Sequence, residues 1–262
     1  MILLKLGGSL ITDKHRLETS RPYVITRLAR EIAQARQEQP EIKLLVGHGS
    51  GSFGHPAAAR HGTHLGASSV ADWLGFAEVW AAAQRLNRLV IDALIEAGLP
   101  AIAFPPSASV TSDDGIILDM AIEPIKRALD TGLLPVVFGD VAFDCTHGST
   151  ILSTEKIFAY LAEYLRPDRV LIAGFDPGVY ANYPHTDEIL PVVTEHDLLE
   201  IPLESAVAPD VTGGMANKVQ EAMTLARTLP DLEVRIFSGE EPGTLISTLL
   251  GGTPGSLITI DK

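Results

Sequence analysis

The chain has 262 residues, of which 46% are hydrophobic and 20% are charged, and its formal net charge at pH 7 is −13. Such an acidic chain repels nucleic acids and anionic membrane surfaces, because binding to a polyanion needs a broad basic face. The single cysteine, Cys145, excludes an intramolecular disulfide framework.

Apolar runs alternate with helical patterns along the chain. The runs that predict buried strands cover residues 2–6, 42–46, 101–104, 134–138, 169–173 and 233–237. Apolar residues recur at helical spacing over 21–37, 70–97, 122–131, 155–165 and 216–228. This alternation predicts an α/β protein, in which helix layers enclose a mostly parallel central sheet in a three-layer αβα sandwich.

Residues 174–209 interrupt the pattern with glycine, proline and asparagine. A short hairpin between residues 178–180 and 192–193 is expected there. We place a lobe boundary before it, so that one domain over residues 1–262 divides into an N-terminal lobe (1–173) and a C-terminal lobe (174–262). No secretory signal and no uninterrupted apolar stretch of about twenty residues is visible. A cytoplasmic protein without membrane partners is therefore expected.

Lysine is rare, with seven residues in the chain, and three of them lie in or beside glycine-rich segments. The first segment covers residues 5–9, where Lys5 ends the first predicted strand and Gly7, Gly8 and Ser9 follow; Lys14 comes soon after. Glycines let backbone N–H groups approach a phosphate, and a lysine supplies a positive charge. A plain turn is the alternative interpretation.

The second segment, residues 47–55, contains four glycines and two serines directly after the second predicted strand. This composition predicts a nest of N–H donors for an anion, with His55 available to bond a phosphate. Alternatively, His48 bonds its own loop, and His61 and His64 face solvent. A zinc site formed by these four histidines lacks a thiolate and any familiar ligand spacing.

Two further segments carry candidate residues. Residues 210–218 open the last long helix, with Gly213 and Gly214 leaving its N-terminus accessible to an anion and Lys218 one turn inside. A capped helix with an exposed lysine is the alternative. Asp140 and the stretch 146–156 supply carboxylates that can orient lysines or help hold Mg²⁺. The alternative is that Ser153 caps the next helix and Lys156 faces water.

Together these segments resemble the amino acid kinase superfamily over nearly the whole chain. The ending Phe53-Gly54-His55 is similar to that of isopentenyl phosphate kinases and the related fosfomycin kinases, whereas acetylglutamate, aspartate, carbamate and uridylate kinases lack this histidine. The resemblance implies an αβα fold, ATP with Mg²⁺, transfer of a phosphoryl group to a small-molecule acceptor such as isopentenyl phosphate, and a homodimer. A fosfomycin-type phosphonate kinase and a non-catalytic nucleotide-binding protein are the alternatives.

The resemblance also implies roles for individual residues. Lys14, His55 and Lys5 would be catalytic, and no dedicated metal ligand is expected. The acceptor would contact Gly49, Ser50, Gly54, His55 and Thr154. The nucleotide would contact Lys5, Gly7, Gly8, Ser9, Asp176, Gly178, Tyr180, Gly213, Gly214 and Lys218. One departure stands out: where archaeal isopentenyl phosphate kinases tend to have Ser-Gly-Asp-Asp, this chain has Ser153, Thr154, Glu155 and Lys156.

Overall fold

A computed structural model describes residues 1–181, 188–197, 214–229 and 231–260. Its main sheet has eight strands in the order β12-β14-β13-β9-β1-β2-β6-β3. These strands are β1 (Ile2–Leu6), β2 (Leu44–His48), β3 (Ala101–Ala103), β6 (Leu134–Phe138), β9 (Arg169–Gly174), β12 (Val192–Val193), β13 (Glu233–Ser238) and β14 (Ser256–Ile258). All neighbours from β3 to β13 pair in parallel, whereas β14 pairs antiparallel with β13, and β12 pairs parallel with β14.

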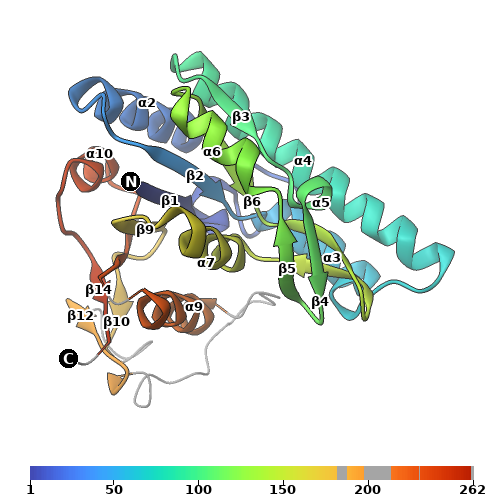
Figure 1. Cartoon of the computed structure of the whole chain (residues 1–262). Helices are drawn as coiled ribbons and strands as arrows, with labels where there is room; N and C mark the ends of the chain where they lie inside the picture. Colours follow the sequence, from blue (N-terminus) through green and yellow to red (C-terminus); the bar gives the residue numbers. More distant parts are fainter. Residues whose placement is uncertain (182–187, 198–213, 230, 261–262) are drawn as a thin grey trace.

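Helices cover both faces of this sheet (Figure 1). The longer helices are α2 (Pro22–Glu38), α3 (Gly51–His61), α4 (Val70–Glu96), α6 (Ile122–Asp130), α7 (Thr154–Leu165) and α9 (Gly214–Thr228). The short ones are α1 (Gly8–Ile11), the 3-10 turn η1 (Thr63–Leu65), α5 (Pro106–Ser109) and α10 (Thr244–Leu249). One apolar core joins the sheet to α2, α3, α4 and α10, and a second joins it to α6, α7 and α9.

Strand β1 lies in the middle of the sheet and is buried along its whole length. Successive side chains of a strand point to opposite faces. Leu4 and Leu6 accordingly pack in the core of α2 and α4, while Leu3 packs in the core of α6, α7 and α9. This alternation places Lys5 on the same face as Leu3, at the carboxyl end of the strand.

The αβα class and the mostly parallel sheet are confirmed, and each predicted strand and helix is present with bounds that differ by at most two residues. The predicted hairpin was wrong in its second strand. β10 (Val179–Tyr180) pairs with β11 (Ile189–Leu190), whereas Val192–Val193 joins the main sheet beside β14. Pro191 separates the two segments, and a proline cannot donate to a ladder of hydrogen bonds.

A second sheet of four strands was not predicted. Its strands are β4 (Val110–Asp113), β5 (Ile116–Met120), β7 (Asp140–Asp144) and β8 (Gly148–Leu152), in the order β5-β4-β7-β8. Because β7 begins just after the end of β6, this sheet lies at the carboxyl ends of the parallel strands. No helix among the described residues has the length and apolar character needed to cross a membrane.

Candidate active site at the carboxyl ends of the strands

The parallel strands end at one level, so the loops that follow them converge. Leu6 is paired in register with His48 on one side and with Ala173 on the other, and His48 is paired with Phe138. In open α/β sheets, ligands bind at this edge, where loops meet helix N-termini. The structure thus brings the first two predicted glycine segments together with Gly139.

The glycines of these loops permit close contact between backbones. A Cβ atom on Gly8 would lie 2.6 Å from the nitrogen of Gly51, and one on Gly49 would lie 2.9 Å from the nitrogen of Gly8. Gly51 also has a positive φ of 48°, a conformation that favours glycine. The hydroxyl of Thr12, which sequence reasoning did not identify, accepts from the Ser52 N–H at 3.0 Å and donates to the Gly8 carbonyl at 2.7 Å.

The predicted nest of N–H donors in residues 47–55 is smaller in the structure than the composition of the segment suggests. Helix α3 begins at Gly51, so the N–H groups of Phe53 and Gly54 bond to the Ser50 carbonyl, and that of Gly49 bonds to the Leu6 carbonyl. In the two loops, over the described residues 7–9 and 49–54, no hydrogen bond to the protein is found for the amides of Gly8, Ser9, Ser50 and Gly51. Such amides at the starts of two helices fit the oxygens of a phosphate.

A buried ion pair lies beside these loops. The ammonium of Lys5 contacts the Glu155 carboxylate at the start of α7, and both side chains are only 7% exposed. The carboxylate of Glu221, on α9, accepts a hydrogen bond from the Ser153 hydroxyl at 3.2 Å. Burial raises the pKa of Glu221, against the opposing effects of Lys5 and of the Ser153 hydrogen bond. Sequence reasoning did not identify Glu221, since one glutamate inside an amphipathic helix carries no signal.

Other predicted residues lie at or near the same edge. Lys14 is exposed, in a loop whose Glu18 N–H bonds to the Ser52 carbonyl on α3. His55 lies half-buried in the first turn of α3, and Lys218 lies half-buried on α9, three residues before Glu221. Gly213 falls outside the described residues, and Gly214 is the first residue of α9.

The predicted nucleotide contacts after β9 lie around one strand end. Asp176 and Tyr180 are half-buried. Gly178 packs tightly on β14, because a Cβ atom there would lie 2.7 Å from the Ser256 hydroxyl. That hydroxyl accepts from the Val179 N–H at 2.8 Å and donates to the Leu190 carbonyl at 2.6 Å.

Thr154 and His48 form a buried connection between α7 and β2. The Thr154 hydroxyl donates to the His48 carbonyl at 2.7 Å, which uses its only proton, so a hydrogen bond to an acceptor would have to come from its backbone N–H. The His48 ring stacks on Phe138 at a centroid distance of 5.3 Å and bonds Asn87 of α4. Burial lowers the pKa of His48, which favours a neutral ring.

Asp140 is a buried carboxylic acid next to Gly139. Its side chain accepts from the Ser107 hydroxyl at 2.7 Å and from the Val141 N–H at 2.9 Å. Burial raises the pKa of Asp140 to about 6, although these hydrogen bonds oppose the shift. The folded chain therefore binds this proton more tightly than the unfolded chain.

This shift predicts a specific dependence of stability on pH. The stabilising contribution of Asp140 is fully present below the ordinary aspartate pKa of 3.8 and is lost as the pH rises through about 6. Asp140→Asn, which resembles the protonated acid, should raise the free energy of unfolding at pH 7 by about 2–3 kcal/mol. Urea unfolding at pH 4, 5, 6 and 7 measures this effect, with Asp231→Asn on the surface as control. A difference between Asp140→Asn and wild type that does not grow with pH would contradict it.

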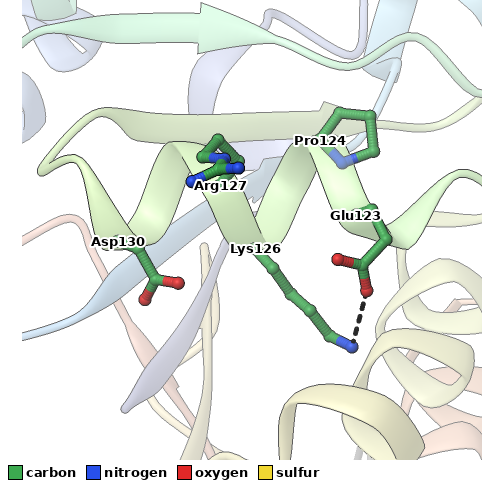
Figure 2. Close-up of a pocket in the computed structure, with 5 residues that line it drawn as sticks. All are labelled: Glu123, Pro124, Lys126, Arg127 and Asp130. Carbon is green, nitrogen blue, oxygen red and sulfur yellow. Dashed lines mark hydrogen bonds and ion pairs between the residues drawn. The ribbon is translucent and has the colours of Figure 1, made fainter.

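Two other regions do not form the site. His61 bonds Glu78 at 2.6 Å, and the described residues contain no group of three or more His, Cys, Asp or Glu side chains placed to hold a metal ion. Figure 2 shows a surface hollow along α6, lined by Glu123, Pro124, Lys126, Arg127 and Asp130. Asp130 pairs with Lys43, which directly precedes β2, so this end of the hollow lies at the opposite edge of the sheet.

A parallel sheet with free helix-start amides and buried lysine at its carboxyl edge defines a class of protein, the α/β phosphotransferases. The sequence matches the amino acid kinase family over residues 1–238, and the chain belongs to that family.

Within this family, the chain is similar to isopentenyl phosphate kinases. The chain is 34% identical to the curated isopentenyl phosphate kinase of Methanothermobacter thermautotrophicus over 96% of both chains, and 30% identical to that of Methanocaldococcus jannaschii over 100% of both. A solved structure titled "X-ray structures of isopentenyl phosphate kinase" has a TM-score of 0.84 at 31% identity, covering 99% of this chain and 100% of that one. A substrate complex of isopentenyl phosphate kinase has a TM-score of 0.79 at 26% identity.

Proposed function

We propose that the chain is an ATP-dependent kinase that converts isopentenyl phosphate to isopentenyl diphosphate. The observation that carries the proposal is the carboxyl edge of the sheet. There, amides at the starts of α1 and α3 that make no hydrogen bond to the described protein lie in the loops beside a buried lysine and a histidine-bearing helix. The relatives that match over nearly their full length carry the same activity in their names.

The proposed reaction moves one phosphoryl group between two phosphates. An oxygen of the acceptor monophosphate forms a bond to the γ-phosphorus of ATP, while the bond from that phosphorus to the β–γ bridging oxygen breaks and ADP leaves. The attacking oxygen is already ionised near neutral pH, so the site needs alignment and positive charge more than a general base. Mg²⁺ bound to the nucleotide phosphates would neutralise part of their charge.

The chain's residues divide into two proposed groups. On the acceptor side, His55 with Gly49, Ser50, Gly54 and the N–H of Thr154 would bind the monophosphate. On the nucleotide side, Lys5 and Lys218 would hold the phosphates, Lys14 would stabilise the transferring group, and the remaining contacts would be Gly7, Gly8, Ser9, Asp176, Gly178, Tyr180, Gly213 and Gly214. The four amides at the starts of α1 and α3 support this division, since two of them lie in the loop after β1 and two in the loop after β2.

A coupled ADP-release assay tests the proposed function. Isopentenyl phosphate, dimethylallyl phosphate, geranyl phosphate, fosfomycin and acetylglutamate are compared as acceptors at equal concentration. The largest kcat/KM is expected for isopentenyl phosphate. A preference for acetylglutamate would overturn the proposal, and a preference for fosfomycin would assign the chain to phosphonate phosphorylation.

His55→Ala tests the acceptor side. Turnover with isopentenyl phosphate should fall at least about tenfold, because a hydrogen bond to a charged group is worth about 1.5–3 kcal/mol. Affinity for a non-hydrolysable ATP analogue, measured by calorimetry, should stay within about twofold of wild type. His64→Ala, which changes an exposed histidine beyond the same helix, is the matched control. Turnover of His55→Ala close to that of the control would remove the assigned role.

We further propose a cytoplasmic homodimer whose N-terminal lobe (1–173) holds the acceptor and whose C-terminal lobe (174–262) holds the nucleotide. The exposed aromatic side chains of α4 support the dimer, since Trp73 and Trp80 are 37% and 43% exposed. Exposed apolar patches of this kind are typical of protein interfaces. The net charge of −13 favours small anionic ligands, held locally, over nucleic acid.

A further inference from the structure

Glu221 of α9 has no role in the proposed reaction, yet it reaches the start of another helix. The Ser153 side chain is the N-cap of α7, and its oxygen accepts the Lys156 N–H at 3.1 Å. The same hydroxyl donates to the two oxygens of Glu221 at 3.2 and 3.4 Å. A carboxylate at this position is also favoured by the dipole of α7. One hydrogen-bonded connection therefore joins α9 to the first turn of α7.

Glu221 also interacts with Lys5 through their opposite charges. Lys5 is held by Glu155, the second residue of α7, and the attraction of Lys5 is the largest effect that opposes the burial of Glu221. Lys156 has a smaller effect on Glu221 than Lys5 has, and its ammonium bonds the Gly115 carbonyl at 3.2 Å. Lys5 thus contacts a carboxylate of α7 and attracts a carboxylate of α9, and these two helices pack side by side (Figure 1).

We propose that Glu221 is a positioning residue for phosphoryl transfer. It fixes α9, and with it Lys218, against α7, the helix whose Glu155 contacts Lys5. Lys218 lies three residues before Glu221, so the two side chains share one side of α9. The lysines on β1 and on α9 come from segments far apart in sequence, and nothing in the sequence sets their separation. The connection from Glu221 through Ser153 to the start of α7 sets it.

This role predicts different results for two substitutions. Glu221→Gln keeps an oxygen that can accept the Ser153 hydrogen bond but removes the charge near Lys5. Glu221→Ala removes both. A phosphate site with one negative charge fewer attracts ATP at least as well in the ground state, whereas misplaced lysines lose transition-state contacts. A drop in kcat without a rise in KM is therefore the signature of positioning, and general damage to the fold would raise KM.

Steady-state kinetics with ATP and isopentenyl phosphate make the test. We expect kcat to fall about tenfold in Glu221→Gln and about a hundredfold in Glu221→Ala, while KM for ATP in Glu221→Gln stays equal or falls up to about threefold. Glu163→Gln, the same substitution on an exposed site of α7, should match wild type. The proposal is overturned by unchanged kcat in Glu221→Ala, or by KM for ATP rising together with a fall in kcat in Glu221→Gln.

The inference rests on the proposed function for its kinetic readout, so a second readout is independent of activity. Amide hydrogen exchange over residues 218–224 should be at least about fivefold faster in Glu221→Ala than in Gln220→Ala, an exposed neighbour on α9. Faster exchange in a protein that phosphorylates no acceptor would refute the proposed kinase function but support the connection between Glu221 and α7. Equal exchange in an active protein would refute the connection alone.

Discussion

Lys5→Met should abolish most of the activity and destabilise the fold at the same time. Counted over the whole residue, Lys5 is 5% exposed and Glu155 is 6% exposed. Methionine would therefore leave a buried carboxylate without its ammonium partner. Removing one member of a buried ion pair costs about 3–5 kcal/mol of unfolding free energy. Loss of a preorganised positive contact to the transferring phosphate should lower kcat by about 100–1,000-fold. Urea unfolding and ADP release at low temperature measure the two effects separately.

The double variant Lys5→Met with Glu155→Gln separates the two roles of this lysine. A neutral amide beside methionine is far cheaper to bury than an unpaired carboxylate. The double variant should therefore recover more than half of the lost unfolding free energy and none of the lost turnover. If turnover recovered together with stability, Lys5 would be a structural residue, and the assignment of the nucleotide site to this edge of the sheet would fail.

Gly8→Ala should have the second-largest effect, through steric conflict alone. A Cβ atom at this position would lie 2.6 Å from the Gly51 nitrogen and 2.8 Å from its Cα, and both are backbone atoms that cannot rotate away. Separating the two loops should cost about 3 kcal/mol of unfolding free energy. The starts of α1 and α3 would move apart by a fraction of an ångström, and such a misplacement should lower turnover about a hundredfold.

Gly174→Ala is the control for this steric argument. It lies at the same edge of the sheet, at the end of β9, where the nearest atoms to an added Cβ lie at 3.9 Å. Its unfolding free energy should stay within about 1 kcal/mol of wild type, because this distance is an ordinary packing contact. Equal destabilisation by both substitutions would show that the contact with Gly51 is not responsible.

The sequence by itself determined the layers of the fold and most of the residues at the candidate site. Strands buried on both faces are continuous apolar runs, and amphipathic helices repeat at their own period, so both signals are local. The glycines that follow residues 6 and 48 were also identified, because a cluster of glycines directly after a strand is a local signal. Their function was only partly predicted, because a glycine that frees an N–H group and a glycine that admits a neighbouring backbone look alike in a sequence.

Tertiary structure alone decided which distant side chains meet. The partners of Lys5 lie 150 residues away on α7 and farther still on α9, and no local pattern encodes such pairing. The four-stranded sheet consists of two local hairpins, β4 with β5 and β7 with β8, and only the pairing of β4 with β7 joins segments that are distant in sequence. The raised pKa of Asp140 likewise depends on burial beside Ser107, which only the packed structure supplies. Sequence periodicity fixes which face of an element is apolar, whereas the neighbour of each polar group depends on how the elements pack together.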